Sequence, residues 1–156
     1  MTNFVEIILP TENATQEIGK KLSHLAQIGD VFCLFGTLGM GKSVLARAFV
    51  QELCGNTEVP SPTFTLLQTY EAPDFDIYHF DLYRIKSPDE IFEIGVEDAI
   101  YSGVSLIEWP EKMSPYLPRD VIKLELLPFN NGRKLIISSK SDKKFARISS
   151  ISKFFR

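Results

Sequence analysis

The chain has 156 residues, of which 44% are hydrophobic and 24% charged, and its formal net charge is −3. These values are ordinary for a soluble globular protein and predict about one domain with a real hydrophobic core. No apolar stretch approaches the roughly 20 residues of a membrane span and no secretory signal opens the chain, so we expect a cytoplasmic protein without a membrane partner. Cys33 and Cys54 are expected to be free thiols rather than a disulfide, and the two histidines lack zinc-ligand spacing.

The first elements in chain order are a strand and a helix. Residues 4–9 have the pattern of a strand, and the turn residues at 10–13 lead into a helix. The apolar positions of this helix recur at helical spacing, at Ile18, Leu22, Leu25 and Ile28.

A complete phosphate-binding loop follows, with the pattern G-x-x-x-x-G-K-S, between a strand predicted at 30–35 and a helix predicted at 43–53. Its residues are Gly36, Thr37, Leu38, Gly39, Met40, Gly41, Lys42 and Ser43. The glycines allow successive backbone N–H groups to converge on phosphates. Lys42 would supply a charge to the β- and γ-phosphates, and the Ser43 hydroxyl would take one Mg²⁺ position at the helix N-terminus. Nucleotide binding, with residues 37–43 as the binding residues, is therefore the first hypothesis.

The remaining elements alternate between strands and helices. Turn residues at 55–62 precede strands at 63–70 and 77–81, a helix N-terminus at 87–90, a strand at 104–108 and a terminal hairpin of 121–127 with 133–138. This order predicts an α/β fold, a P-loop NTPase-like three-layer sandwich whose central sheet is mostly parallel with antiparallel edge strands. The ligand should lie at the carboxyl ends of the central strands.

Two carboxylates end strands of this predicted sheet. Mg²⁺–nucleotide chemistry needs an acidic anchor for the ion beyond Ser43, and both Asp81 and Glu108 qualify. Spacing alone does not rank them. Whichever of the two carboxylates does not anchor the ion is the natural candidate for positioning the attacking oxygen.

Three further positions have both a functional and a structural interpretation. Thr63, in the segment Ser61-Pro62-Thr63-Phe64-Thr65, could donate to a γ-phosphate or to metal-bound water, or could lie in a rigid turn. His79 is expected to be a packed core or edge residue rather than a catalytic base. Trp109 is expected to pack half-buried, with a partner contact as the alternative.

Positive charge gathers at the end of the chain. Residues 133–156 contain eight Lys or Arg and one Asp, whereas residues 1–132 contain nine basic and nineteen acidic residues. We therefore divide the chain into a P-loop ATPase domain at 1–139 and a basic C-terminal tail at 140–156, which either extends the domain or belongs to it. The tail could meet RNA phosphates or an acidic partner, or could simply be a solvated segment.

Four motifs together resemble the TsaE (YjeE) family of small bacterial ATPases in order and spacing. They are the phosphate-binding loop, the S-P-T-F-T segment at 61–65, His79-Phe80-Asp81-Leu82-Tyr83-Arg84, and Ile107-Glu108-Trp109-Pro110-Glu111-Lys112. The resemblance implies an ATPase needed to form N6-threonylcarbamoyladenosine next to the anticodon of tRNAs reading codons that begin with A. It also implies ATP and Mg²⁺ as cofactors and the TsaB–TsaD complex as partner, with tRNA reached through that complex.

The resemblance also implies roles for individual residues. Lys42 and Ser43 correspond to residues that bind phosphate and Mg²⁺. Glu108 resembles the second Mg²⁺ ligand, and Asp81 resembles a residue essential for hydrolysis. Thr11, or a neighbour before the first helix, corresponds to a segment that touches the nucleotide base.

Two other functions share the phosphate-binding loop. A small-molecule or nucleotide kinase would ordinarily need an acceptor-binding lid with several arginines, and the arginines after Arg47 are scattered. A non-hydrolytic module, in which ATP only sets the shape offered to a partner, is the alternative that is not an enzyme. A GTPase is disfavoured because the chain has no N-K-x-D motif to read the base.

Overall fold

The computed structural model describes residues 3–37, 39–60 and 66–154. Its strands are β1 (Asn3–Leu9), β2 (Val31–Phe35), β3 (Leu67–Glu71), β4 (Asp76–Asp81), β5 (Val104–Glu108), β6 (Ile122–Phe129) and β7 (Gly132–Ser139). They form one sheet in the order β1-β7-β6-β2-β5-β4-β3. The central strands β6, β2, β5 and β4 are parallel to one another, while β3, β7 and β1 are added by antiparallel pairing. The predicted mostly parallel sheet with antiparallel edges is confirmed.

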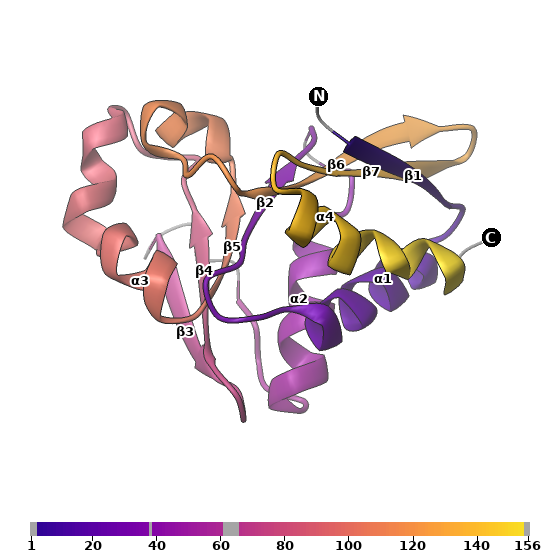
Figure 1. Cartoon of the computed structure of the whole chain (residues 1–156), viewed down its shortest axis with the longest axis horizontal. Coiled ribbons are helices and arrows are strands. Elements are labelled where there is room, and N and C mark those ends of the chain that lie inside the picture. The colour runs from indigo at the N-terminus through magenta and orange to yellow at the C-terminus, as the bar shows by residue number, and fades with distance from the viewer. Residues whose placement is uncertain (1–2, 38, 61–65, 155–156) are drawn as a thin grey trace.

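The helices cover the sheet in two layers. They are α1 (Glu12–Leu25), α2 (Lys42–Cys54), α3 (Val96–Ser102) and α4 (Asp142–Ser149), with the 3₁₀ helices η1 (Pro88–Ile94), η2 (Pro110–Tyr116) and η3 (Ser150–Phe154). Figure 1 shows α1, α2 and α4 together, with α3 apart from them beside β3, β4 and β5. Among the described residues, no helix is long and apolar enough to cross a membrane.

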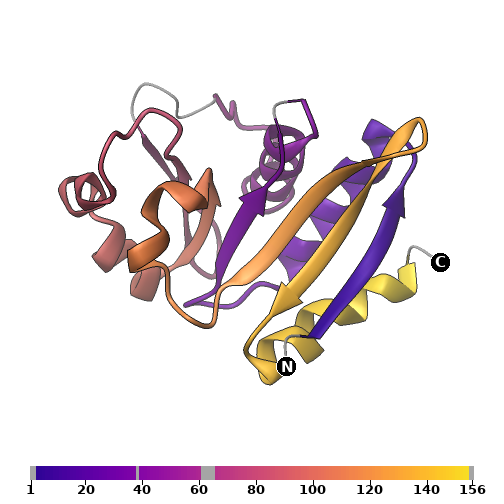
Figure 2. The ribbon, with the colours of Figure 1, turned by 90° about the horizontal axis from the view of Figure 1, so that it is seen from above.

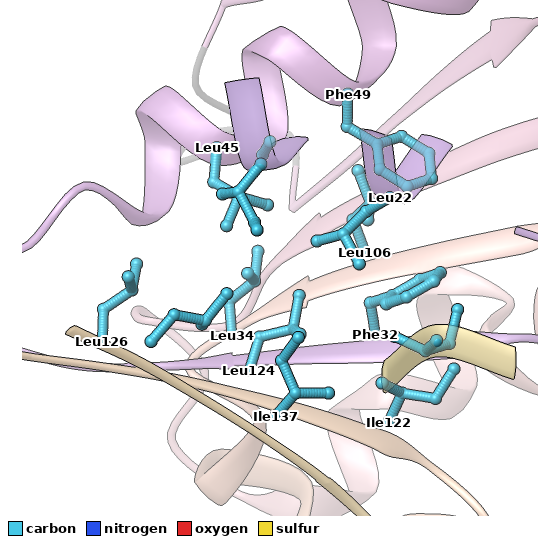
Figure 3. Close-up of a cluster of buried hydrophobic side chains, with 14 of the residues drawn as sticks. Leu22, Phe32, Leu34, Leu45, Phe49, Leu106, Ile122, Leu124, Leu126 and Ile137 are labelled. Atoms are coloured by element: carbon cyan, nitrogen blue, oxygen red, sulfur yellow. The ribbon is translucent and has the colours of Figure 1, made fainter. Parts of the chain in front are cut away.

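Two hydrophobic clusters hold these layers together. The larger lies between the sheet and α1 and α2, where Leu45 and Phe49 of α2 point toward Phe32 and Leu34 of β2 (Figure 3). The smaller joins residues of β2, β4 and β5 to η1, α3 and η2. Because alternate residues of β2 enter the two clusters, this strand is buried on both faces, as a central parallel strand must be.

Local sequence sets the ends of these elements. The Thr11 hydroxyl caps α1 by accepting from the Ala14 N–H, and η1 begins with a capping box between Ser87 and Glu90. The β6–β7 hairpin turns where Asn130 has φ 51°. A side chain at Gly132 would meet the Leu9 carbonyl oxygen at 2.7 Å, so the turn needs glycine there.

Two predicted boundaries were wrong. Helix α1 ends at Leu25, and Ile28, taken as a fourth apolar helix position, lies beyond it and is 59% exposed. The strand predicted at 63–70 begins at Leu67, with residues 61–65 outside the described part of the chain. The helix N-terminus predicted at 87–90 is confirmed, since η1 begins at Pro88 after the Ser87 cap, and this 3₁₀ helix passes through Gly95 into α3.

The basic C-terminal segment packs on the domain. Residues Ile148 and Ile151 are fully buried in the larger cluster, so the alternative of a purely solvated segment was wrong. Arg147 donates two hydrogen bonds to the buried Asp30 carboxylate, at 2.7 and 2.8 Å, just before β2. Figure 2 shows α4 running beside β1 and β7.

Candidate functional site

The phosphate-binding loop opens onto a cleft at the carboxyl ends of β2, β4 and β5, where the ligand was expected. The cleft has a volume of about 460 Å³. The lining residues come from five parts of the chain: Glu12, Gly39, Gly41, Lys42, Ser43, Val44, Asp81, Tyr83, Glu108, Trp109 and Arg133. The structure thus brings the loop and the two strand-ending carboxylates together around one space.

The loop ends on a left-handed glycine. Gly41 has φ 101° and precedes α2 without a side-chain cap, so the N–H groups of the first helical turn are not occupied by a capping side chain. Its carbonyl oxygen accepts the first helical hydrogen bond, from Leu45 N at 2.9 Å. The positive φ of Gly41 is what requires glycine here, whereas the atom nearest to an added Cβ, Arg133 Nη1 at 2.6 Å, is the end of a flexible side chain that could move. This start of a helix provides the N–H groups and the dipole that favour an anion.

Lys42 is the first residue of α2, and it is only 5% exposed. Its Nζ lies 3.7 Å from the centre of the Trp109 ring, a cation–π contact. Burial lowers the pKa of the Lys42 ammonium from its ordinary value, and this effect is opposed chiefly by the nearby charge of Glu108. The lysine is therefore a poorly hydrated cation beside carboxylates, suited to meeting a phosphate.

Glu108 is the centre of a short chain of polar contacts. The Ser43 hydroxyl donates to Glu108 Oε1 at 3.3 Å, and His79 Nε2 lies 2.7 Å from Glu108 Oε2. Glu108 is 4% exposed and His79 2%. Both oxygens of this carboxylate are thus engaged, one of them by the serine predicted to bind Mg²⁺.

Asp81 lies beside Glu108, because the two residues are directly paired between β4 and β5. The side chain of Asp81 is buried and lines the cleft. Its Oδ1 accepts a hydrogen bond from the backbone N–H of Tyr83 at 3.0 Å. The sheet therefore presents two carboxylates side by side, in the same cleft as the phosphate-binding loop.

The donor set of this cleft fits magnesium held together with a nucleotide. Mg²⁺ is usually bound by one or two protein oxygens plus waters and phosphates, and adjacent ligands of its octahedron are about 2.9 Å apart. The Ser43 and Glu108 oxygens, 3.3 Å apart, can take two such positions after a small shift. Among the described residues, no cluster of three or more His, Cys, Asp or Glu side chains forms a metal site made by protein alone.

The other residues predicted to bind the nucleotide have varied surroundings. Thr37 and Met40 hold the loop's own shape, since the Thr37 carbonyl accepts from Met40 N at 3.3 Å. Thr11 caps α1, and its neighbour Glu12 lines the cleft instead. Leu38 and Thr63 lie outside the described residues.

Two residues that make side-chain hydrogen bonds in the site were not predicted from the sequence. His79 was expected to be buried, and it is, but its contact with a site carboxylate was not foreseen. The available signal was its spacing, since His79 and Asp81 are two apart on a strand and share a face. Arg133, taken as one of several scattered arginines, lines the cleft and donates to the Met40 carbonyl at 3.3 Å. No local pattern indicates this contact, because the hairpin brings Arg133 to the loop across 93 positions of sequence.

Comparisons with known proteins agree on one family. The family model described as "Threonylcarbamoyl adenosine biosynthesis protein TsaE" matches residues 9–135. A tRNA threonylcarbamoyladenosine biosynthesis protein TsaE from Rickettsia conorii is 39% identical, over 95% of this chain and 85% of its own length. The protein of the same name from Haemophilus influenzae is 33% identical, over 86% of this chain and 96% of its own length.

A solved structure supports the fold. The crystal structure of Bacillus subtilis YdiB matches all of this chain and 97% of its own, with a TM-score of 0.75 and 24% sequence identity. At that identity the match bears on the fold alone, and it confirms the predicted P-loop NTPase-like architecture.

Proposed function

We propose that this chain, which belongs to the TsaE family and so to the proteins of tRNA threonylcarbamoyladenosine biosynthesis, is the Mg²⁺-dependent ATPase of that modification. The observation that carries the proposal is the contact between Ser43 and Glu108, 3.3 Å apart, at the end of the phosphate-binding loop. This contact supports a single binding site that holds a nucleotide phosphate and a divalent ion together.

Different residues of the cleft would bind the phosphates and the metal ion. The N–H groups at the start of α2 would hold the phosphates, and Lys42 would move from the Trp109 ring to meet their charge. The Ser43 and Glu108 oxygens would hold Mg²⁺, which when bound neutralises charge that develops on the transferred phosphoryl group. Arg133, through its bond to the Met40 carbonyl, would keep the loop in its binding shape.

Asp81 is our candidate for positioning the attacking water. Hydrolysis needs a group that orients the water in line with the bond that breaks, and a carboxylate beside the phosphate site can accept a hydrogen bond from it. Asp81 lines the cleft and is paired in register with Glu108. Its Oδ1 is held by the Tyr83 N–H, so the carboxylate is oriented before a substrate arrives.

We further propose that the chain acts together with the TsaB–TsaD complex and reaches tRNA through it. Family membership supports this partnership. In this arrangement ATP turnover changes the shape that the chain offers to the complex, while the threonylcarbamoyl transfer takes place on the partner.

Release of phosphate separates an ATPase from a module that only binds ATP. We expect this chain, mixed with TsaB–TsaD, ATP and Mg²⁺, to release free phosphate over many turnovers, with little release when Lys42→Ala replaces the parent. Phosphate release that stays at the level of the Lys42→Ala sample, despite tight ATP binding by the parent, would favour the non-hydrolytic module.

A further inference from the structure

The buried histidine beside Glu108 has no part in the roles assigned above, although its contact is one of the shortest in the site. His79 lies on β4, two residues before Asp81. Its Nε2 is 2.7 Å from Glu108 Oε2, and the two side chains are 3% and 5% exposed. Such a contact, shielded from water, fixes both groups relative to each other.

The direction of this hydrogen bond follows from chemistry. An ionised carboxylate only accepts, so the imidazole must carry its hydrogen on Nε2 and donate it to Glu108. The other ring nitrogen, Nδ1, is buried and has no hydrogen-bond partner among the described residues. Among the described residues, the hydrogen bond to Glu108 is therefore the polar interaction that orients the His79 ring.

The carboxylate would be much less constrained without this bond. Rotation about the last torsion of a glutamate is broad, so one oxygen alone does not define where the other points. With Oε2 held by His79, Oε1 is directed to the Ser43 hydroxyl, 3.3 Å away. The histidine itself does not line the cleft as far as the structure describes it, whereas Glu108 does.

We propose that His79 is a positioning residue, which holds the Glu108 carboxylate so that Glu108 Oε1 and Ser43 Oγ face one Mg²⁺ site. The inference rests on the proposed function, because it assumes that Glu108 binds the ion. Partners that orient a metal ligand typically change metal affinity by 10- to 100-fold when removed. The effect of His79 should therefore appear in the need for Mg²⁺ rather than in contacts with the nucleotide.

Two substitutions test whether the effect of His79 depends on the hydrogen bond donated from Nε2 or only on a polar side chain at this position. In His79→Gln the amide nitrogen can occupy the place of Nε2 and donate to Glu108, whereas in His79→Asn the amide reaches only the place of Nδ1. Binding of a non-hydrolysable ATP analogue is measured by calorimetry at graded Mg²⁺ concentrations and in EDTA. We expect His79→Asn to raise the Mg²⁺ concentration for half-maximal binding by about 10- to 100-fold, with affinity in EDTA unchanged. His79→Gln should stay within about threefold of the parent, since it keeps the donor.

The chain contains its own matched control. His24 and Glu52 form a second histidine–carboxylate pair, 2.6 Å apart on the surface, with side chains 60% and 33% exposed. His24→Asn removes a contact of the same chemistry away from the cleft. The Mg²⁺ dependence of this variant should equal that of the parent.

A second measurement needs no change at His79. A long-range ¹H–¹⁵N spectrum of the folded protein distinguishes the two neutral tautomers of each ring, and the His24→Asn sample identifies the His79 signals. We expect the hydrogen on Nε2. If His79→Asn fails to fold, this spectrum decides whether the proposed hydrogen bond exists.

Three results would overturn the proposal: His79→Asn with the Mg²⁺ dependence of the parent, His79→Gln as impaired as His79→Asn, or a hydrogen found on Nδ1 alone. Failure of the proposed function looks different. In that case the parent itself would bind the analogue equally with and without Mg²⁺.

Discussion

At the scale of single residues, the ammonium group of Lys42 rests on an aromatic ring in a protein whose cleft is rich in carboxylates. Its Nζ is 3.7 Å from the Trp109 ring centre, and burial lowers its pKa. A phosphate that enters the cleft replaces this weak contact with a charge-assisted hydrogen bond. The gain is large because Lys42 is only 5% exposed and has little water to lose.

The substitution Lys42→Ala should therefore weaken ATP binding in the presence of Mg²⁺ while leaving the fold intact. The lost contact is worth roughly 1.5–3 kcal/mol, which corresponds to about a 10- to 150-fold weaker affinity. Titration calorimetry measures the affinity, and thermal unfolding checks the fold. Lys86→Ala, which changes an exposed lysine, is the control. An affinity unchanged by Lys42→Ala contradicts the assignment of the loop.

The two strand-ending carboxylates should differ in what they control. Glu108→Gln removes charge from the group that contacts Ser43, so it should raise the Mg²⁺ concentration needed for activity. Asp81→Asn keeps a similar shape but accepts a hydrogen bond from water less strongly, so turnover should fall while nucleotide affinity is nearly retained. Phosphate release measured over a range of Mg²⁺ concentrations tests both. If each variant showed the Mg²⁺ dependence and the turnover of the parent, this division of roles would be wrong.

Residues of the site differed in how far the sequence revealed them. The loop and the two carboxylates could be placed because their signals are local, a glycine pattern in one case and the end of an apolar strand in the other. Arg133 could not, because its position depends on how the β6–β7 hairpin packs beside Met40. For His79 the sequence indicated burial, but its contact with Glu108 depends on the pairing of two strands that η1 and α3 separate in the chain.

At the scale of elements, helix α4 is fastened to the start of β2 by a buried ion pair. Arg147 forms two hydrogen bonds with Asp30, whose side chain is 2% exposed, and a third with the Leu25 carbonyl at 2.7 Å. Lys144 approaches the same carboxylate at 4.0 Å. Breaking such a pair leaves a buried charge without its main partner, which is costly.

Arg147→Ala should accordingly lower the free energy of unfolding by about 3 kcal/mol. The matched control is Lys143→Ala on the exposed side of the same helix, which should change stability by no more than about 0.5 kcal/mol. Urea unfolding of both variants measures the difference. An Arg147→Ala variant as stable as the control would show that α4 is not fastened in this way.

Elements with short, strongly patterned sequences were predicted closely, and those fixed by distant contacts were not. The strand predicted at 104–108 has those bounds in the structure, because its apolar sequence ends at a charged residue. The predicted helix was too long at Ile28, because this residue continues the apolar spacing although α1 has already ended. Periodicity alone does not show where a helix leaves the core. Residues 140–154 look solvated by charge, yet two isoleucines among the basic residues bury one face of the segment.

At the scale of the whole molecule, charge is divided between an acidic body and a basic end. The nineteen acidic residues of the first 132 positions contrast with eight Lys or Arg after them. Removing the basic end would also remove the buried Ile148 and Ile151, so truncation cannot test its charge alone. Exposed lysines can be changed without touching the core.

Reversing the charge at Lys140, Lys143 and Lys153, all exposed, should weaken binding to the TsaB–TsaD–tRNA assembly at low salt and leave ATP binding unchanged. Neutralised phosphates or carboxylates release counterions, so the difference from the parent should shrink as salt rises. Binding is measured with and without tRNA, which distinguishes a contact with RNA from one with protein. Lys86→Glu serves as a control on another part of the surface. Equal binding by the reversed and parent chains at low ionic strength would remove this role.

The most direct test of the account measures N6-threonylcarbamoyladenosine in tRNA made by TsaB–TsaD over many turnovers, with the parent chain, with Lys42→Ala, or with neither. We expect sustained formation with the parent and none beyond the background with Lys42→Ala, because the phosphate-binding cleft drives the cycle. Equal formation with the parent and Lys42→Ala would contradict it, since the chain would then serve the modification without the chemistry of its cleft.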